Sequence, residues 1–198
     1  MKQLISFFNH PLLKLPVIFG LLAGVLCFGY FLALYALGIM PLGNHKVLDF
    51  GFQIIMMVAA VWYYRKHIGK GFLHLWEALS ICYVVNTVGA MLTAWLIYLF
   101  LKYIDPTIFT QYLDEMRQLI VSTKGRLVET LGQAEYVKML KNVDLITLET
   151  LVGDEISKKT VLAILPVLII SLLFRRQDYS LYNPTPDLPN PSESPKSN

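Results

Sequence analysis

The stretch from Pro16 to Met40 constrains the fold most strongly, because it contains 25 consecutive residues without a charge. As an α-helix it would extend about 37 Å, which is enough to cross the roughly 30 Å hydrocarbon core of a bilayer with some tilt. Lys2 and Lys14 precede it, as in a signal peptide, but the block is far longer than a signal-peptide core and no small-residue cleavage site follows. We therefore expect an uncleaved transmembrane helix over residues 16–40.

Three further apolar blocks predict three more spans, over residues 47–64, 78–101 and 160–174. The last would extend only about 22 Å, but Lys159 before it and Arg175 after it can reach towards the headgroups. Hydrophobic residues make up 55% of the chain and charged residues 16%, against about 25% charged residues in soluble domains. The composition thus argues against a water-soluble enzyme and predicts an all-α integral membrane protein of four helices.

The short segments outside these spans differ in positive charge. Residues 1–15, the connection between the second and third spans, and the residues directly after the fourth span hold most of the cations, whereas the first connection carries only Lys46. By the positive-inside rule this places the N- and C-termini in the cytoplasm. The segment 102–159, between the third and fourth spans, is then extracytoplasmic.

The segment 102–159 has the periodicity of amphipathic helices. Asp105 and Pro106 are typical of a helix start, apolar residues then recur at helical spacing, and Gly125 is expected to break the run before a second amphipathic stretch. We expect a packed helical cap, with a partner-binding surface as the alternative. Whether these helices lie on the membrane or pack as a hairpin stays open.

Residues 177–198 differ from the rest of the chain. They hold five of the ten prolines, together with Ser, Asn and Asp. Such a stretch buries too little apolar area to offset the entropy of ordering, so we expect a disordered cytoplasmic tail.

Small residues mark where helices can approach closely. Gly20 and Gly24 form a GxxxG pattern in the first span, and Gly89, Ala90 and Ala94 lie in the third. Small side chains let helix backbones come together in lipid. We favour packing between these two spans of one chain; homodimerisation through the glycines is the alternative.

Polar side chains within the predicted spans are the candidates for function: Asp49, Gln53, Asn86 and Thr87. Asn86 and Thr87 are expected to supply a hydrogen bond between helices. For Asp49 we favour an interfacial carboxylate paired with Lys46 or with Lys158 or Lys159. An ion or substrate contact is the alternative, because intramembrane ionisable groups often line transport paths.

No motif in the sequence carries a recognisable chemistry. His74 and Glu77 share one helix face but lack the HExxH pattern, and Cys27 and Cys82 both lie in apolar blocks. We predict no catalytic, cofactor-binding or metal-binding residue, and the net charge of +3 is too small to indicate nucleic acid.

The predicted function is therefore non-enzymatic, through contacts with the lipid bilayer, a membrane-protein partner or a second copy. The alternative is a small transporter or channel subunit whose polar path lies near Asp49, Gln53 and Asn86.

Several short segments, in this order, carry a family resemblance: His10–Lys14, Tyr63–Lys66, Gly71–Phe72, Trp76–Ala78, Tyr103–Pro106 and Leu165–Arg176. Their order and spacing over roughly residues 10–176 resemble the DUF4199 family of small bacterial four-span membrane proteins. The resemblance implies a multi-pass protein of the bacterial inner membrane. It implies no activity, cofactor or catalytic residue.

Overall fold

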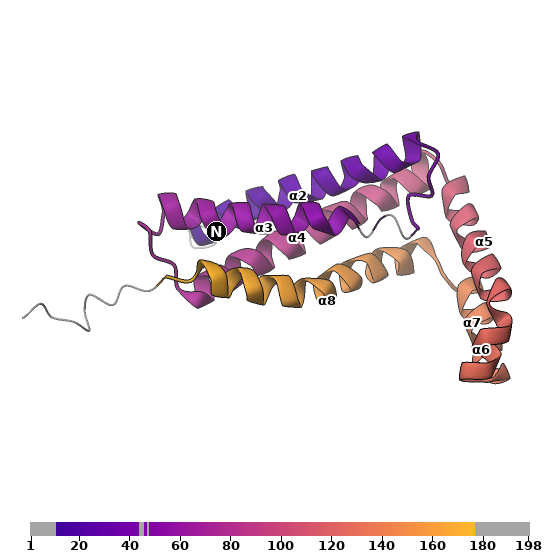
Figure 1. The fold of residues 1–198 in the computed structure, drawn as a ribbon. Helices are drawn as coiled ribbons and strands as arrows, with labels where there is room; N and C mark the ends of the chain where they lie inside the picture. Colours follow the sequence, from indigo (N-terminus) through magenta and orange to yellow (C-terminus); the bar gives the residue numbers. More distant parts are fainter. Residues whose placement is uncertain (1–10, 44–45, 47, 177–198) are drawn as a thin grey trace, which may run out of the picture.

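The computed structural model describes residues 11–43, 46 and 48–176, and its regular secondary structure there is entirely helical. The four longest helices lie side by side as an elongated bundle (Figure 1): α2 (Pro11–Ala36), α3 (Asp49–His67), α4 (Leu75–Tyr103) and α8 (Leu148–Phe174). Three shorter helices stand together beyond one end of it, and we call residues 107–144 the arm: α5 (Thr107–Ser122), α6 (Lys124–Leu131) and α7 (Gln133–Asp144). The predicted all-α class is confirmed for the described residues.

Helix α4 lies at the centre of the bundle and contacts α2, α3 and α8. Its first turn is capped by a reciprocal pair, in which the backbone N–H of His74 donates to Glu77 Oε2 at 2.9 Å. Ile81, Cys82 and Val85 of α4 are fully buried in the main apolar core. His74 and Glu77 thus form a helix cap.

The two ends of the bundle are distinguished by their connections. At one end, Leu73 and Arg176 exchange backbone hydrogen bonds of 2.9 and 3.0 Å, which joins the α3–α4 connection to the residues after α8. The other end carries the α2–α3 connection and the arm (Figure 1). We call these the tail end and the arm end. Helix α3 runs from the arm end to the tail end.

Among the described residues, three helices are long and apolar enough to cross a membrane, over Leu12–Ala36, Leu75–Tyr103 and Leu148–Phe174. Large apolar side chains point outward from them; Leu165 and Leu173 of α8 are 69% and 74% exposed. Exposing so much apolar surface is unfavourable in water and natural in lipid. The apolar helices therefore fit a membrane protein.

The helices predicted for the first three spans agree with α2, α3 and α4 in order and to within about five residues at each end, but α3 is not among the three candidate spans. The fourth differs, because the helix expected over 160–174 begins at Leu148. Thr147 caps it reciprocally with Thr150, and the helix continues through Gly153 into the apolar run. The segment 102–159 therefore comprises the arm and the first turns of α8.

The breaks inside the arm also differ from the sequence prediction. Gly125 was expected to end the first amphipathic helix, but it lies inside α6. The break falls at Thr123, whose Oγ1 donates to the carbonyl oxygen of Leu119 at 2.7 Å. Gly132, with φ of +86°, separates α6 from α7, as a glycine in the left-handed region can. The predicted tail, residues 177–198, lies outside the described residues.

Candidate polar site at the arm end of the bundle

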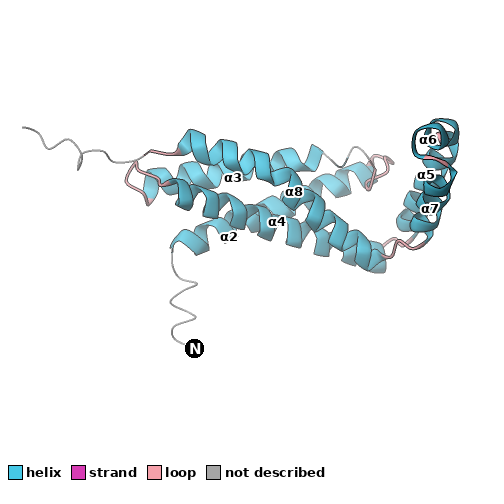
Figure 2. Ribbon diagram, turned by 90° about the horizontal axis from the view of Figure 1, so that it is seen from below, coloured by secondary structure: helices cyan, strands magenta, loops and turns pink. Residues whose placement is uncertain are grey.

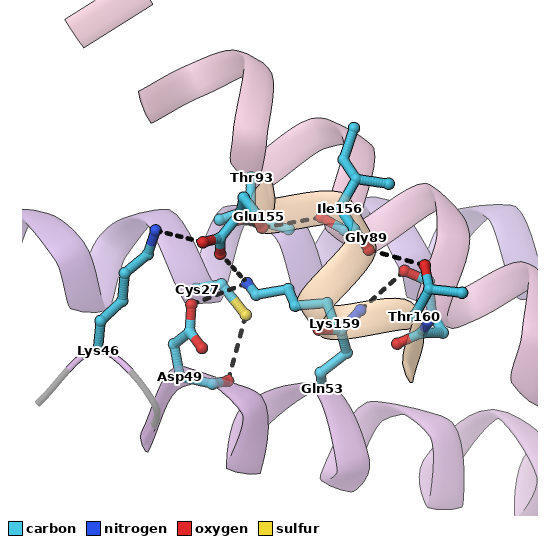
Figure 3. Close-up of polar contacts among 12 residues, drawn as sticks. Cys27, Lys46, Asp49, Gln53, Gly89, Thr93, Glu155, Ile156, Lys159 and Thr160 are labelled. Carbon is cyan, nitrogen blue, oxygen red and sulfur yellow. Dashed lines mark hydrogen bonds and ion pairs between the residues drawn. The ribbon is translucent and has the colours of Figure 1, made fainter. Parts of the chain in front are cut away.

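Four charged side chains meet at the arm end of the bundle (Figure 3): Lys46, Asp49, Glu155 and Lys159. We call them the charge cluster. Asp49 is the first residue of α3, Lys46 precedes it, and Glu155 and Lys159 are one turn apart on α8. The cluster thus joins two chain segments that are more than a hundred residues apart.

The charges alternate in sign along the cluster. Lys46 Nζ lies 2.6 Å from Glu155 Oε2, Lys159 Nζ lies 3.1 Å from Glu155 Oε1, and Lys159 Nζ lies 2.8 Å from Asp49 Oδ2. The Asp49 and Lys159 side chains are only 4% and 5% exposed. Buried charges of this kind are tolerable only when they are paired, so each partner depends on the others.

Lys46 lies in the α2–α3 connection, outside the candidate spans. Burial lowers the pKa of its ammonium group, and the Glu155 carboxylate beside it opposes that shift. The ion pair with Glu155 is strong because the surroundings have a low dielectric constant. It attaches the α2–α3 connection to α8.

A line of polar groups continues from the cluster into the bundle. Cys27 Sγ donates to the carbonyl oxygen of Asp49 at 3.3 Å, and Gln53 lies one turn deeper on α3. Gln53 Nε2 donates to the carbonyl oxygen of Asn86 at 2.8 Å and is fully buried. The structure therefore brings Asp49, Gln53 and Asn86 together on facing helices.

Several of these buried polar atoms have no hydrogen-bond partner in the described chain: Gln53 Oε1, Asn86 Oδ1, Thr87 Oγ1 and Ser171 Oγ. Each such atom costs free energy when it is removed from water without a partner. Thr87, expected to bond across helices, makes no such bond through its hydroxyl oxygen. Thr93 of α4 does, because its hydroxyl lies 3.4 Å from the carbonyl oxygen of Gly24 on α2, besides donating within its own helix to the carbonyl oxygen of Gly89 at 2.8 Å.

The small residues singled out by sequence meet within one chain. A Cβ placed on Gly20 would lie 2.8 Å from Val88 Cβ, and one placed on Gly24 would lie 2.8 Å from Leu92 Cβ. Gly89 faces Gly20 in turn, since a Cβ there would lie 3.3 Å from the carbonyl oxygen of Gly20. Helices α2 and α4 therefore approach at a distance that larger side chains would prevent.

The two alanines singled out in α4 are also buried: Ala90 is fully buried and Ala94 is 1% exposed.

A cavity of about 480 Å³ opens beside the charge cluster. Its walls come from the α2–α3 connection and from α3, α5 and α8: Leu42, Gly43, Lys46, Asp49, Phe50, Tyr112, Glu115, Met116, Leu119, Leu151, Asp154, Glu155, Lys158, Lys159 and Leu162. Burial, together with the carboxylates of Asp154 and Glu155, raises the pKa of the Tyr112 hydroxyl, which lies outside the candidate spans. The cavity is thus both amphipathic and rich in carboxylates.

Sequence reasoning found part of this site. It singled out Asp49 and named Lys159 among its partners, and that ion pair is present. It missed Glu155 as the shared partner of both lysines, and it missed the contribution of α5 to the cavity. The four-residue spacing of Glu155 and Lys159 directly before an apolar run was the available signal.

In the described part of the chain, no group of three or more His, Cys, Asp or Glu side chains could hold a metal ion. Cys27 and Cys82 are both buried and unlinked.

Comparison with known families matches residues 18–176 to the family described as "Protein of unknown function (DUF4199)". The chain belongs to the DUF4199 family. The resemblance drawn from the sequence is confirmed, and the match includes the charge cluster and every residue around the cavity of this DUF4199 protein. Searches of curated proteins and of solved structures returned no match.

Proposed function

We propose that this DUF4199 protein crosses the bacterial inner membrane four times, with both termini in the cytoplasm and the arm outside. Helices α2 and α4 are candidate spans, and α3 connects the arm end of α2 to the tail end of α4 (Figure 1). If α2 and α4 cross, α3 has to cross as well, and its 19 residues extend about 28 Å. The cations of the tail end, such as Arg65, Lys66 and Arg176, favour a cytoplasmic tail end.

Reporter fusions in intact cells test this topology. We expect fusions after Lys70 and Arg176 to report from the cytoplasm, and a fusion after Thr123 to report from outside. A cytoplasmic signal from the Thr123 fusion would contradict the proposal.

We further propose that the protein is not an enzyme and acts through contacts with lipid or with a membrane-protein partner. One observation supports the contact role: the arm lies across the bundle axis instead of continuing it, as two views at right angles agree (Figures 1 and 2). In the proposed topology, an arm in that position runs along the membrane surface. Apolar side chains are exposed on it, including Leu119 and Leu131 at 62% and 50%, and Leu145, the residue directly after the arm, is 72% exposed.

Site-directed photocrosslinking in membranes tests the contact. A photoreactive residue in place of Leu145 should crosslink to lipid or to another membrane protein. The same residue in place of Lys141, also exposed but polar and on the preceding helix turn, is the matched control. Equal yields from the two positions would argue against an apolar contact surface on the arm.

A second candidate, a small transporter or channel subunit, is favoured by the unpaired oxygens of Gln53 and Asn86 beneath Asp49. Polar groups without partners inside a membrane bundle are typical of a path for water or ions. Flux measured in reconstituted liposomes discriminates the two candidates. Ion or solute movement that is abolished by both Asp49→Asn and Asn86→Leu, in variants that still fold, would favour transport over a contact role.

A further inference from the structure

The cavity at the arm end has two kinds of wall. One wall is apolar and comes from α5, α3 and α8, with Met116, Phe50 and Leu162 among its members. The other is charged and is formed largely by α8 together with the charge cluster. An occupant that satisfies both walls must be amphipathic.

The apolar wall continues into the outward surface of α8. Leu162 lines the cavity and is itself 52% exposed. Leu165 and Ile169, one and two turns farther along the helix, are 69% and 55% exposed within a candidate span. A hydrocarbon chain can therefore lead from the cavity onto the side of the bundle without crossing a polar surface.

On the charged wall, acidic residues outnumber basic ones by one. Seven ionisable Lys, Asp and Glu residues line the cavity, four acidic and three basic: Asp49, Glu115, Asp154, Glu155, Lys46, Lys158 and Lys159. The four members of the charge cluster pair with one another, whereas Glu115, Asp154 and Lys158 are exposed at the rim. The rim thus offers two anionic groups and one cationic group to a ligand.

The carboxylates open to a ligand are those at the rim, because both oxygens of Glu155 already have partners: Oε2 pairs with Lys46 at 2.6 Å and Oε1 with Lys159 at 3.1 Å. Glu115 and Asp154 are exposed and form no ion pair within the described residues. A carboxylate oxygen is stabilised by an N–H or O–H donor. A primary ammonium group supplies such donors, and a trimethylammonium group has none.

We propose that this cavity binds the headgroup of a zwitterionic phospholipid that carries a primary ammonium group, as in phosphatidylethanolamine. The ammonium lies against Asp154 and Glu115, the phosphate faces Lys158, and the acyl chains follow α8 past Leu162. An anionic lipid would place a net negative charge against the acid surplus. The inference rests on the proposed membrane position of the arm end and adds the class of lipid that it contacts.

Native mass spectrometry of the full chain in detergent micelles tests the proposal. Phosphatidylethanolamine, phosphatidylcholine and phosphatidylglycerol with identical acyl chains are added in turn. We expect phosphatidylethanolamine to give a bound fraction that corresponds to at least about tenfold tighter binding than either of the others. Equal binding of the three lipids would overturn the proposal.

Two pairs of variants locate the site. Leu162→Trp enlarges a residue that lines the cavity and should remove the preference for phosphatidylethanolamine, whereas Leu22→Trp, which alters a 50% exposed residue of α2 outside the cavity, should retain it. Asp154→Lys should weaken phosphatidylethanolamine binding several-fold, and Glu129→Lys on α6, also exposed, should not. A preference that survives both Leu162→Trp and Asp154→Lys would place the lipid elsewhere and overturn the assignment.

A water-soluble control separates lipid from a soluble zwitterion. If phosphoethanolamine without acyl chains binds as tightly as the lipid, the occupant is a soluble metabolite and the lipid proposal is wrong. The micelle assay does not depend on orientation. Equal lipid binding together with the expected fusion signals would therefore overturn this inference alone, and a failed Thr123 fusion would overturn the topology alone.

Discussion

Replacing Lys159 by methionine should destabilise the bundle strongly. The change keeps the length of the side chain but leaves the Asp49 carboxylate, 4% exposed, without the cation at 2.8 Å. Glu155 retains Lys46 at 2.6 Å, so the loss falls mainly on Asp49. Removing one partner of a buried ion pair costs about 3–5 kcal/mol, or a factor of roughly a hundred to several thousand in the folded-to-unfolded ratio.

Reversible unfolding in mixed micelles of a non-ionic detergent and SDS, followed by circular dichroism, measures this cost. The double variant Asp49→Leu with Lys159→Met should recover about 2 kcal/mol or more, because it removes both charges. Lys138→Met is the control: Lys138 pairs with Glu135 at 3.4 Å on the exposed surface of α7, and its loss should cost less than about 1 kcal/mol. If Lys159→Met costs no more than Lys138→Met, the charge cluster does not stabilise the bundle and the reasoning is refuted.

Two further predictions concern helix packing and helix capping. Gly24→Leu should lower the free energy of unfolding by about 1–3 kcal/mol in the same assay, because its Cβ would lie 2.8 Å from Leu92 Cβ; Gly29→Leu, with nothing within 4 Å, should be close to neutral. Asp105 accepts a hydrogen bond from the backbone N–H of Thr107 at 3.0 Å, and hydrogen bonds from Thr107 hold the pKa of this carboxyl below its usual value. Its stabilising effect on the start of α5 is therefore present at neutral pH and is lost as the pH falls through that lowered pKa. Hydrogen exchange at the first turn of α5 should show this loss as weaker protection in acid. The Asp105→Ala variant should show no such pH-dependent loss of protection.

The sequence predicted the number and order of the bundle helices well, since uncharged runs such as residues 16–40 have few alternatives to a helix in lipid. It predicted the start of the last helix poorly. A span is expected from Thr160, where the apolar run begins, but the helix starts after the Thr147 cap. Glu155 and Lys159 therefore lie on this helix, with their side chains largely buried. Hydropathy measures where a helix is apolar, and a cap decides where it begins.

The candidate site was partly predictable, because some of its residues stand directly beside apolar runs in the sequence. Asp49 stood out as an acidic residue at the edge of a span, and the lysines before the last span were visible as partners. The contribution of Glu155 and of α5 to the cavity was not visible, because both depend on how the arm returns to the bundle. Contacts between residues about a hundred positions apart have no periodicity in the sequence.

The amino-acid sequence by itself determined that this DUF4199 chain is helical and apolar over most of its length, because only a hydrogen-bonded helix satisfies the backbone of a long uncharged stretch in hydrocarbon. The tertiary structure alone decided that Lys46, Asp49, Glu155 and Lys159 share one buried cluster and that the arm lies across the end of the bundle. Charge pairing in a low-dielectric interior depends on distances of a few ångströms, and those distances are set by the packing of helices against one another.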